Sequence, residues 1–261
     1  MPSGVAITKS AEANVRSSGT FNTSFGGNGQ AVALTDNSLL KALSPDFRSE
    51  LAEELELVEL RYRQVLFRPE DSAHFVYFPL SGVISILAVT GDSTGVEVAS
   101  VGREGMANVN LFLGVDHAQC EAVVQVPGTV ARLSGAALQR HTEHGGELAR
   151  LLLRYTSAYL GQLSQSVACN RLHPLEERCA RWLLMMQDRA GDQFPITHEF
   201  LSNMLGVRRA TVTVAAGLLQ KAGLIRYTRG KMTILDRAGL EQASCECYQT
   251  VREMYQRMLA Q

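Results

Sequence analysis

From Ile196 to Leu219 the sequence reads ITHEFLSNMLGVRRATVTVAAGLL. Thr197 is the residue type that caps a helix N-terminus, so a helix is expected to follow it and to run to Leu205. Gly206 permits the left-handed backbone that lets two helices meet at a steep angle. A second helix is expected from about Arg208, and this order predicts a helix-turn-helix. The positions of the second helix that would face the core are Val212, Ala215, Ala216 and Leu219.

The outward face of the second helix is expected to meet DNA. A recognition helix presents its first turns to base edges in the major groove. Arginine can bridge the acceptors of guanine, and short threonine or alanine side chains can touch a thymine methyl group. The threonine hydroxyls could equally bind phosphate and only set the register. The predicted DNA contacts in this region are Thr197, Arg208, Arg209, Ala210, Thr211 and Thr213.

A basic hairpin is predicted immediately after the second helix. Residues 224–235 read LIRYTRGKMTIL, which indicates two short strands around an Arg-Gly-Lys turn, with Arg229 and Lys231 available to the phosphate backbone. Residues 196–237 hold seven basic and two acidic side chains, although the whole chain carries a net charge of −1. Such a local basic patch is what phosphate contact requires. The simpler alternative is a solvated basic face on an ordinary helix pair. The order of elements instead favours a winged helix-turn-helix at about Thr197–Arg237.

The N-terminal half has the pattern of short strands. Runs rich in β-branched and aromatic residues recur between residues 63 and 133, and Ser81-Gly82 and Pro127-Gly128 are turn signals between them. This spacing predicts a small antiparallel barrel or sandwich. Together with the C-terminal helices, it predicts an α+β fold with four parts. These are a flexible tail at 1–36, a sensor β-barrel at 37–145, a dimerisation helix at 146–172 and the winged DNA-binding domain at 173–261.

The helix at 146–172 carries an apolar stripe at steps of three and four residues. A stripe of this kind on a long connecting helix often pairs with a copy of itself, so we expect it to form a homodimer. The alternative is packing against the barrel of the same chain. The predicted dimer seam consists of Leu148, Leu151, Leu152, Tyr155, Tyr159 and Leu163.

The chain resembles the Crp/Fnr family, the group of the cyclic-AMP receptor protein and the fumarate-nitrate reductase regulator. The resemblance covers about Leu39–Arg237 and is carried by residues 197–235 and by YFPLSGVI at 77–84. It implies a cyclic-nucleotide-binding-like jelly roll, a homodimer, a two-fold symmetric site on double-stranded DNA and contact with RNA polymerase. Arg209 falls where the family commonly has a DNA-contacting arginine. Ala210 and Val214 replace a glutamate and an arginine of many members, which implies a different target sequence.

The resemblance does not extend to the family's nucleotide ligands. No Arg-Ser or Arg-Thr pair occurs around residues 117–121, and Ala107-Asn108 stands in place of the family's Gly-Glu. Burying a cyclic phosphate without a cation is costly, so cyclic AMP is not expected and the effector is unassigned. An iron–sulfur cluster of the family's type needs N-terminal cysteines, whereas the first cysteine here is Cys120. Haem is an open alternative, because His74 and His117 lie in the barrel region and histidine can ligate haem iron. Single histidines are, however, usually ordinary core or surface residues.

Five cysteines with scattered spacing argue against a disulfide framework and favour the reducing cytoplasm. Cys245 and Cys247 form a close pair that could join a metal or redox site. With no second pair in the sequence, a structural pair is favoured and no metal site is predicted. The chain has no signal-peptide core, no transmembrane-length apolar run and no enzyme motif, so neither a membrane protein nor an enzyme is expected. The alternative to a DNA-binding regulator is a small-molecule sensor that acts by docking to another protein.

Overall fold

The computed structural model describes residues 32–91 and 95–260. Most of the predicted tail, residues 1–31, lies outside the described residues. Its last part is not a tail, because Leu34–Asp36 forms a 3₁₀ turn (η1) and Leu34 is buried in the core of the N-terminal half. The boundary predicted at residue 36 is therefore too late in the sequence. In the described residues, every helix is too short or too polar to cross a lipid bilayer.

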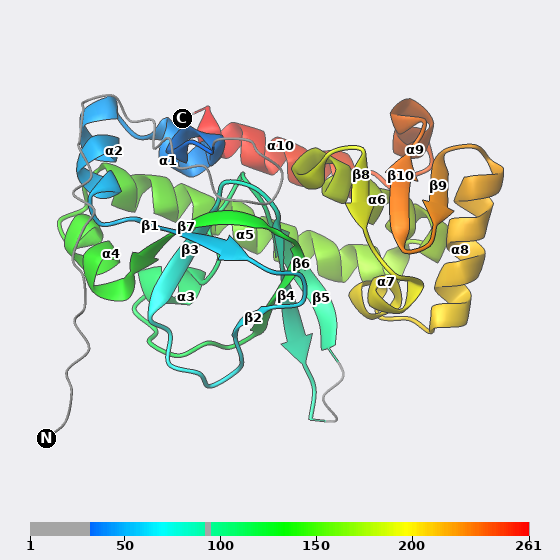
Figure 1. Cartoon of the computed structure of the whole chain (residues 1–261), viewed down its shortest axis with the longest axis horizontal. Helices are drawn as coiled ribbons and strands as arrows, with labels where there is room; N and C mark the ends of the chain where they lie inside the picture. The colour runs from blue at the N-terminus through cyan, green and yellow to red at the C-terminus, as the bar shows by residue number, and fades with distance from the viewer. Residues whose placement is uncertain (1–31, 92–94, 261) are drawn as a thin grey trace, which may run out of the picture.

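The N-terminal half contains two antiparallel sheets, as the strand pattern predicts (Figure 1). The first has the order β1 (Glu56–Leu60), β7 (Gly128–Ser134), β3 (Phe75–Pro79). The second has the order β2 (Val65–Phe67), β6 (Glu121–Val126), β4 (Val83–Val89), β5 (Gly95–Val101). Side chains from both sheets share one buried cluster. Around them lie α1 (Ser38–Ala42), α2 (Pro45–Ala52), α3 (Val109–Phe112) and α4 (Gly135–Thr142).

The two turn signals of the sequence meet in space. Gly82 has a φ of 79°, and a Cβ atom there would lie 2.6 Å from the carbonyl oxygen of Val126. A Cβ atom on Gly128 would lie 2.4 Å from the carbonyl oxygen of Ser81. Both positions need glycine because the β3–β4 and β6–β7 turns pack backbone against backbone.

The long helix α5 (Glu147–Leu172) buries the stripe that was predicted to dimerise. Leu148, Leu151, Leu152 and Tyr155 are each no more than 2% exposed, and Tyr155 donates a hydrogen bond to the Met106 carbonyl at 2.8 Å. Their partners are the chain's own β-sheets and C-terminal helix. The predicted seam is therefore wrong at these four positions, because the intramolecular core already covers them. Tyr159 and Leu163 also pack against that core.

A different face of α5 points to solvent. Its exposed apolar residues are Leu153, Leu160 and Val167, which are 60%, 56% and 70% exposed. They alternate with exposed polar positions to give a continuous series at steps of three and four residues. That series is Arg150, Leu153, Ser157, Leu160, Ser164, Val167 and Arg171.

The C-terminal half is a winged helix-turn-helix followed by a returning helix. Its elements are α6 (Leu175–Ala190), β8 (Gln193–Pro195), α7 (His198–Leu205), α8 (Arg209–Lys221), β9 (Ile225–Thr228), β10 (Lys231–Ile234), α9 (Arg237–Gln242) and α10 (Cys247–Leu259). The three strands form a sheet in the order β8-β10-β9. Helix α10 leaves this domain and packs along α5 toward α1 (Figure 1). The last helix of the unit predicted at 173–261 therefore packs mainly on the N-terminal core, through Val251, Tyr255 and Met258, although Tyr248 at its start belongs to the core of the winged domain.

The two halves are joined by a buried polar interface. The indole nitrogen of Trp182 on α6 donates to the Glu97 carboxylate on β5 at 2.9 Å. Arg189 on α6 forms an ion pair with Glu104 at 2.7 Å and donates to the Ser100 hydroxyl at 3.1 Å. Strand β5 also packs against α7. The helix-turn-helix is thus docked directly on the barrel sheet as well as linked to it through α5.

Candidate nucleic-acid interface

The helix-turn-helix geometry follows the sequence prediction closely. The Thr197 hydroxyl accepts a hydrogen bond from the Phe200 amide at 3.1 Å and caps α7. Gly206 ends α7 with a φ of 64°, which is the left-handed backbone that the turn requires. A Cβ atom at this position would lie 3.0 Å from Val96 on β5. Gly206 therefore serves both the turn and the close approach of the barrel.

Helix α8 divides into a buried and an exposed face. Its buried residues are the four predicted from the sequence, Val212, Ala215, Ala216 and Leu219. Arg208 occupies the N-cap position, so the helix begins one residue later than expected, at Arg209. The predicted contact residues Arg208, Arg209, Ala210, Thr211 and Thr213 are all exposed. Val214 and Leu218 are exposed beside them, by 61% and 50%.

Thr213 is held by a contact that sequence reasoning missed. Its hydroxyl donates to the Arg209 carbonyl at 3.0 Å and lies 3.0 Å from Nδ1 of His198. The His198 ring stacks on Tyr227 of β9 at a centroid distance of 4.2 Å. Burial, followed by the charge of Arg209, lowers the pKa of His198. These residues tie α7, α8 and the hairpin together, and their separation in sequence leaves no local signal of the contact.

The hairpin has the predicted Arg-Gly turn. Thr228 pairs with Lys231 across it, and Arg229 and Gly230 have φ values of 50° and 79°. The Ile196 amide donates to the Gly230 carbonyl at 2.8 Å, which fixes the turn beside the start of α7. Figure 1 shows the hairpin turn and the first turn of α8 at the same end of the domain. The predicted contacts Arg229 and Lys231 are exposed at that end.

A basic surface results, which we call the α8–wing surface. Within the described chain, its members are exposed and none has a carboxylate within ion-pair distance. They are Arg208, Arg209, Lys221, Arg226, Arg229 and Lys231. Cations without protein partners are available to neutralise phosphates and release condensed counterions.

The residues that align with a nucleotide site serve the protein's own backbone. Asn108 adopts a left-handed conformation with a φ of 72°, and its amide donates to the Phe75 carbonyl at 2.9 Å. Ala107 forms backbone hydrogen bonds with Tyr77. His117 lies beside Asp116 at 3.3 Å on the surface. This segment offers no cation to a cyclic phosphate.

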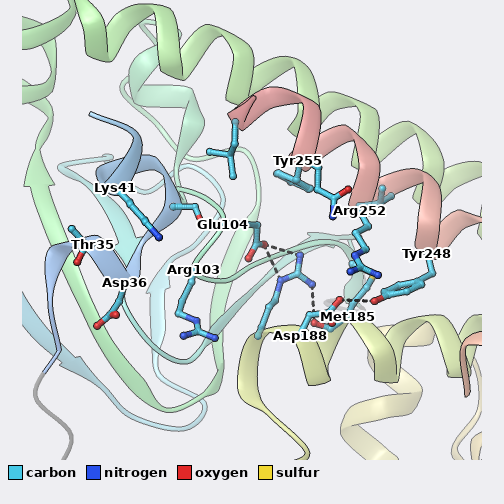
Figure 2. Close-up of a pocket in the computed structure, with 15 residues that line it drawn as sticks. Thr35, Asp36, Lys41, Arg103, Glu104, Met185, Asp188, Tyr248, Arg252 and Tyr255 are labelled. Atoms are coloured by element: carbon cyan, nitrogen blue, oxygen red, sulfur yellow. Dashed lines mark hydrogen bonds and ion pairs between the residues drawn. The ribbon is translucent and has the colours of Figure 1, made fainter. Parts of the chain in front are cut away.

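A cavity of about 520 Å³ lies between η1–α1, the end of β5, α6 and α10. Figure 2 shows Lys41 and Arg103 on one side of it and Arg252 on the other. Glu104 lines it while paired with Arg189. The volume is in the range of small-molecule sites. The cavity touches both halves of the chain, although sequence reasoning indicated no site there.

Comparison with known proteins matches each half of the chain to a domain family. The family model of the cyclic nucleotide-binding domain matches residues 57–144. The family model of the Crp-like helix-turn-helix domain matches residues 177–243, so the two matches cover more than half of the chain. The chain belongs to the Crp/Fnr family of transcription regulators. This Crp/Fnr protein is a DNA-binding regulator, and its α8 is the second helix of the motif that the family uses.

Several solved structures share the fold. FixK2 from Bradyrhizobium japonicum has a TM-score of 0.60 at 15% identity, covering 73% of this chain and 98% of its own. The c-di-GMP responsive global regulator CLP of Xanthomonas campestris has a TM-score of 0.59 at 18% identity, with 73% and 99% covered. A CRP/FNR-family regulator from Thermus thermophilus has a TM-score of 0.59 at 21% identity, with 72% and 98% covered. A search of curated proteins found no match.

Proposed function

We propose that this regulator acts in the cytoplasm as a homodimer that binds a two-fold symmetric site on double-stranded DNA and controls transcription there. The observation that carries the proposal is the α8–wing surface, whose six exposed cations on α8 and its hairpin have no carboxylate of the described residues within ion-pair distance. Contact with RNA polymerase, which the family resemblance implies, belongs to the same proposal.

The roles of the contact residues follow from their positions. Arg209, on the first turn of α8, is assigned to a guanine edge, and Ala210 and Thr211 to thymine methyl groups or phosphate. Arg208, Arg229 and Lys231 are assigned to phosphates, because they flank α8 at the N-cap and the wing. Thr213 orients His198, and Thr197 contributes through its helix cap rather than through a free hydroxyl.

The dimer is assigned to the outward face of α5. Leu153, Leu160 and Val167 recur every seven residues, and the intervening Ser157 and Ser164 are small enough to let a second helix approach closely. This is the alternation of a two-helix seam. A second copy of α5 is the occupant that fits, because a self-complementary stripe satisfies two-fold symmetry.

We assign the regulatory signal to a conformational change of the barrel domain. The change would reach the winged domain through the interface between β5 and the helices α6 and α7. The Glu97–Trp182 and Arg189–Glu104 contacts fix the present docking of the winged domain. A ligand that changes these contacts would change the spacing of two recognition helices. Cyclic AMP is not the expected effector.

The test is selection and sequencing of genomic fragments bound by the purified full chain across a salt series. Wild type is expected to enrich a two-fold symmetric motif, with affinity falling steeply as salt rises. Arg209→Ala is expected to lose preference at one base of each half-site, by about 1–3 kcal/mol. Arg257→Ala, which removes an exposed arginine from α10, is the matched control and should leave the motif intact.

The competing function is a sensor that docks to a protein through the same surface. Salt-independent binding to DNA without any enriched motif, unchanged by Arg209→Ala, would support docking and contradict the proposal.

A further inference from the structure

Four potential metal ligands converge where α5 ends. Cys169 lies in the last turn of α5 and His173 is the C-cap residue of that helix, and Cys245 and Cys247 flank Glu246 at the start of α10. Their ligand atoms all lie within 4.8 Å of one another. The sequence alone favours a structural role for Cys245 and Cys247, because it holds no second close pair of cysteines. The folded chain supplies the two missing donors from α5.

The spacing of the donor atoms fits a tetrahedral ion. The sulfur atoms of Cys169 and Cys245 are 3.5 Å apart, and the Cys247 sulfur is 3.4 Å from Nδ1 of His173. Zinc bonded at about 2.3 Å to sulfur and about 2.05 Å to nitrogen separates two sulfurs by about 3.8 Å and a sulfur from a nitrogen by about 3.6 Å. A disulfide needs sulfurs at about 2.05 Å, so the three thiols are arranged around a point rather than paired.

The surroundings orient the donors as an outer coordination shell does. With Nδ1 of His173 facing the sulfurs, its Nε2 lies 3.3 Å from the Glu246 carboxylate. Histidine ligands commonly hold a carboxylate or carbonyl on the second ring nitrogen, which fixes the tautomer. The Gln165 amide donates to the Cys247 sulfur at 3.1 Å, a contact that favours a thiolate.

The three thiols are buried beside a cation. Cys169 and Cys247 are fully buried and Cys245 is 4% exposed, so the thiols are shielded from bulk water. Arg181 on α6 is 8% exposed and interacts electrostatically with Cys169, which places a positive charge near the cluster. Cys179, by contrast, lies outside the cluster in an apolar core.

We propose that Cys169, His173, Cys245 and Cys247 bind one Zn²⁺ ion in a closed structural site. Binding replaces the three thiol protons, which leave to solvent, and three thiolates with neutral His173 leave the centre with one negative charge beside Arg181. No coordination position remains for water or substrate, as in other structural Cys₃His sites. The ion would join the C-terminal end of α5 to the start of α10, beside the His173-Pro174 link to the winged domain. The proposal is independent of DNA binding.

The test measures metal in the full chain, purified under reducing conditions without added metal or chelator. About one zinc per chain is expected, with X-ray absorption showing three sulfurs and one nitrogen. Cobalt exchange should give the visible bands of tetrahedral Co²⁺ and a thiolate charge-transfer absorption. Cys245→Ser should weaken that absorption, and Cys120→Ser, which removes a thiol elsewhere, should leave it unchanged.

A milder variant tests the outer shell without removing a ligand. Glu246→Gln is expected to weaken zinc about tenfold in competition with a chelator, at the low end for such groups because the carboxylate is largely exposed. Substoichiometric zinc together with no tetrahedral cobalt spectrum in the reduced wild type would overturn the proposal. A Cys169–Cys245 disulfide in the protein as purified, with no metal uptake after reduction, would overturn it in favour of a redox pair.

Discussion

Replacing Glu97 with glutamine is expected to remove a pH dependence from the stability of the docked chain. Burial raises the pKa of this carboxyl from 4.5 to about 7, against the opposing hydrogen bonds from Ser85 and Trp182. The Ser85 hydroxyl lies 2.6 Å from the Glu97 carboxylate and 2.8 Å from the side-chain amide oxygen of Gln125, and it has one proton to donate. A protonated Glu97 can donate to Ser85, and then both contacts are satisfied.

The sign follows from the raised value in the folded chain. Well below pH 4.5 the Glu97 carboxyl is protonated in both the folded and the unfolded chain, and its titration does not lower the stability. As pH rises toward 7, the unfolded chain releases a proton that the folded chain retains. The wild type therefore loses stability as pH rises from about 4.5 to about 7, by about 3 kcal/mol in total. Glu97→Gln carries no such proton, so its stability relative to wild type should rise by about 2–3 kcal/mol between pH 5 and pH 8.

The assay is urea unfolding of both proteins at several pH values, followed by the fluorescence of Trp182. This is the only tryptophan of the chain, and it contacts Glu97 directly. Taking the difference between the two proteins cancels the titration of other groups. A difference that stays constant from pH 5 to pH 8 would refute the reasoning, because Glu97 would then titrate alike in the folded and unfolded chains.

Three further changes test separate parts of the structure. Leu160→Glu is expected to convert the proposed dimer into a folded monomer in sedimentation experiments. Leu113→Glu, at an exposed leucine on the barrel, should leave the dimer intact. A dimer that survives Leu160→Glu would exclude the outward face of α5 as its interface. Gly206→Ala should lower the free energy of unfolding in urea by about 1–2 kcal/mol, because the position has a positive φ. Gly217→Ala, with open space around it, should raise the free energy of unfolding by about 1 kcal/mol. Equal effects of the two substitutions would contradict the turn geometry. Arg229→Gly keeps the turn and should weaken DNA binding alike for all sequences, lowering the salt slope by about 1; a change in base preference would reassign Arg229 to a base.

The sequence predicted the helix-turn-helix well because its signals are local. Gly206 ends one helix, and the spacing of Val212, Ala215, Ala216 and Leu219 fixes which face of the next is buried. The Arg229-Gly230 turn likewise determines the hairpin without help from distant residues. In each case the residues that give the sequence pattern are neighbours in the chain and themselves form the element.

The proposed dimer seam could not be located in this way. Helix α5 carries two apolar stripes at helical spacing, one through Leu148 and Tyr155 and one through Leu153 and Leu160. Periodicity shows that a face is apolar, but it does not show whether the same chain or a second copy covers it. The barrel and α10 cover the first stripe, a contact that depends on the whole fold.

Long-range contacts also explain the sites that were missed. Cys169 and Cys245 are 76 positions apart, and they meet only because α10 turns back along α5. Glu97 and Trp182 are 85 positions apart and meet through the docking of α6 on the barrel. The Cys245–Cys247 pair is visible in the sequence, but Cys169, Glu97 and Trp182 belong to no motif that would reveal their partners.

In the proposed dimer, two copies of α8 read adjacent major grooves of one DNA site. Hydroxyl-radical footprinting on a selected fragment examines this arrangement, with wild type and Leu160→Glu compared at equal chain concentration. Wild type should protect two segments about one helical turn apart, and the variant should protect neither at that concentration. A single protected segment, bound equally tightly by the variant, would contradict it.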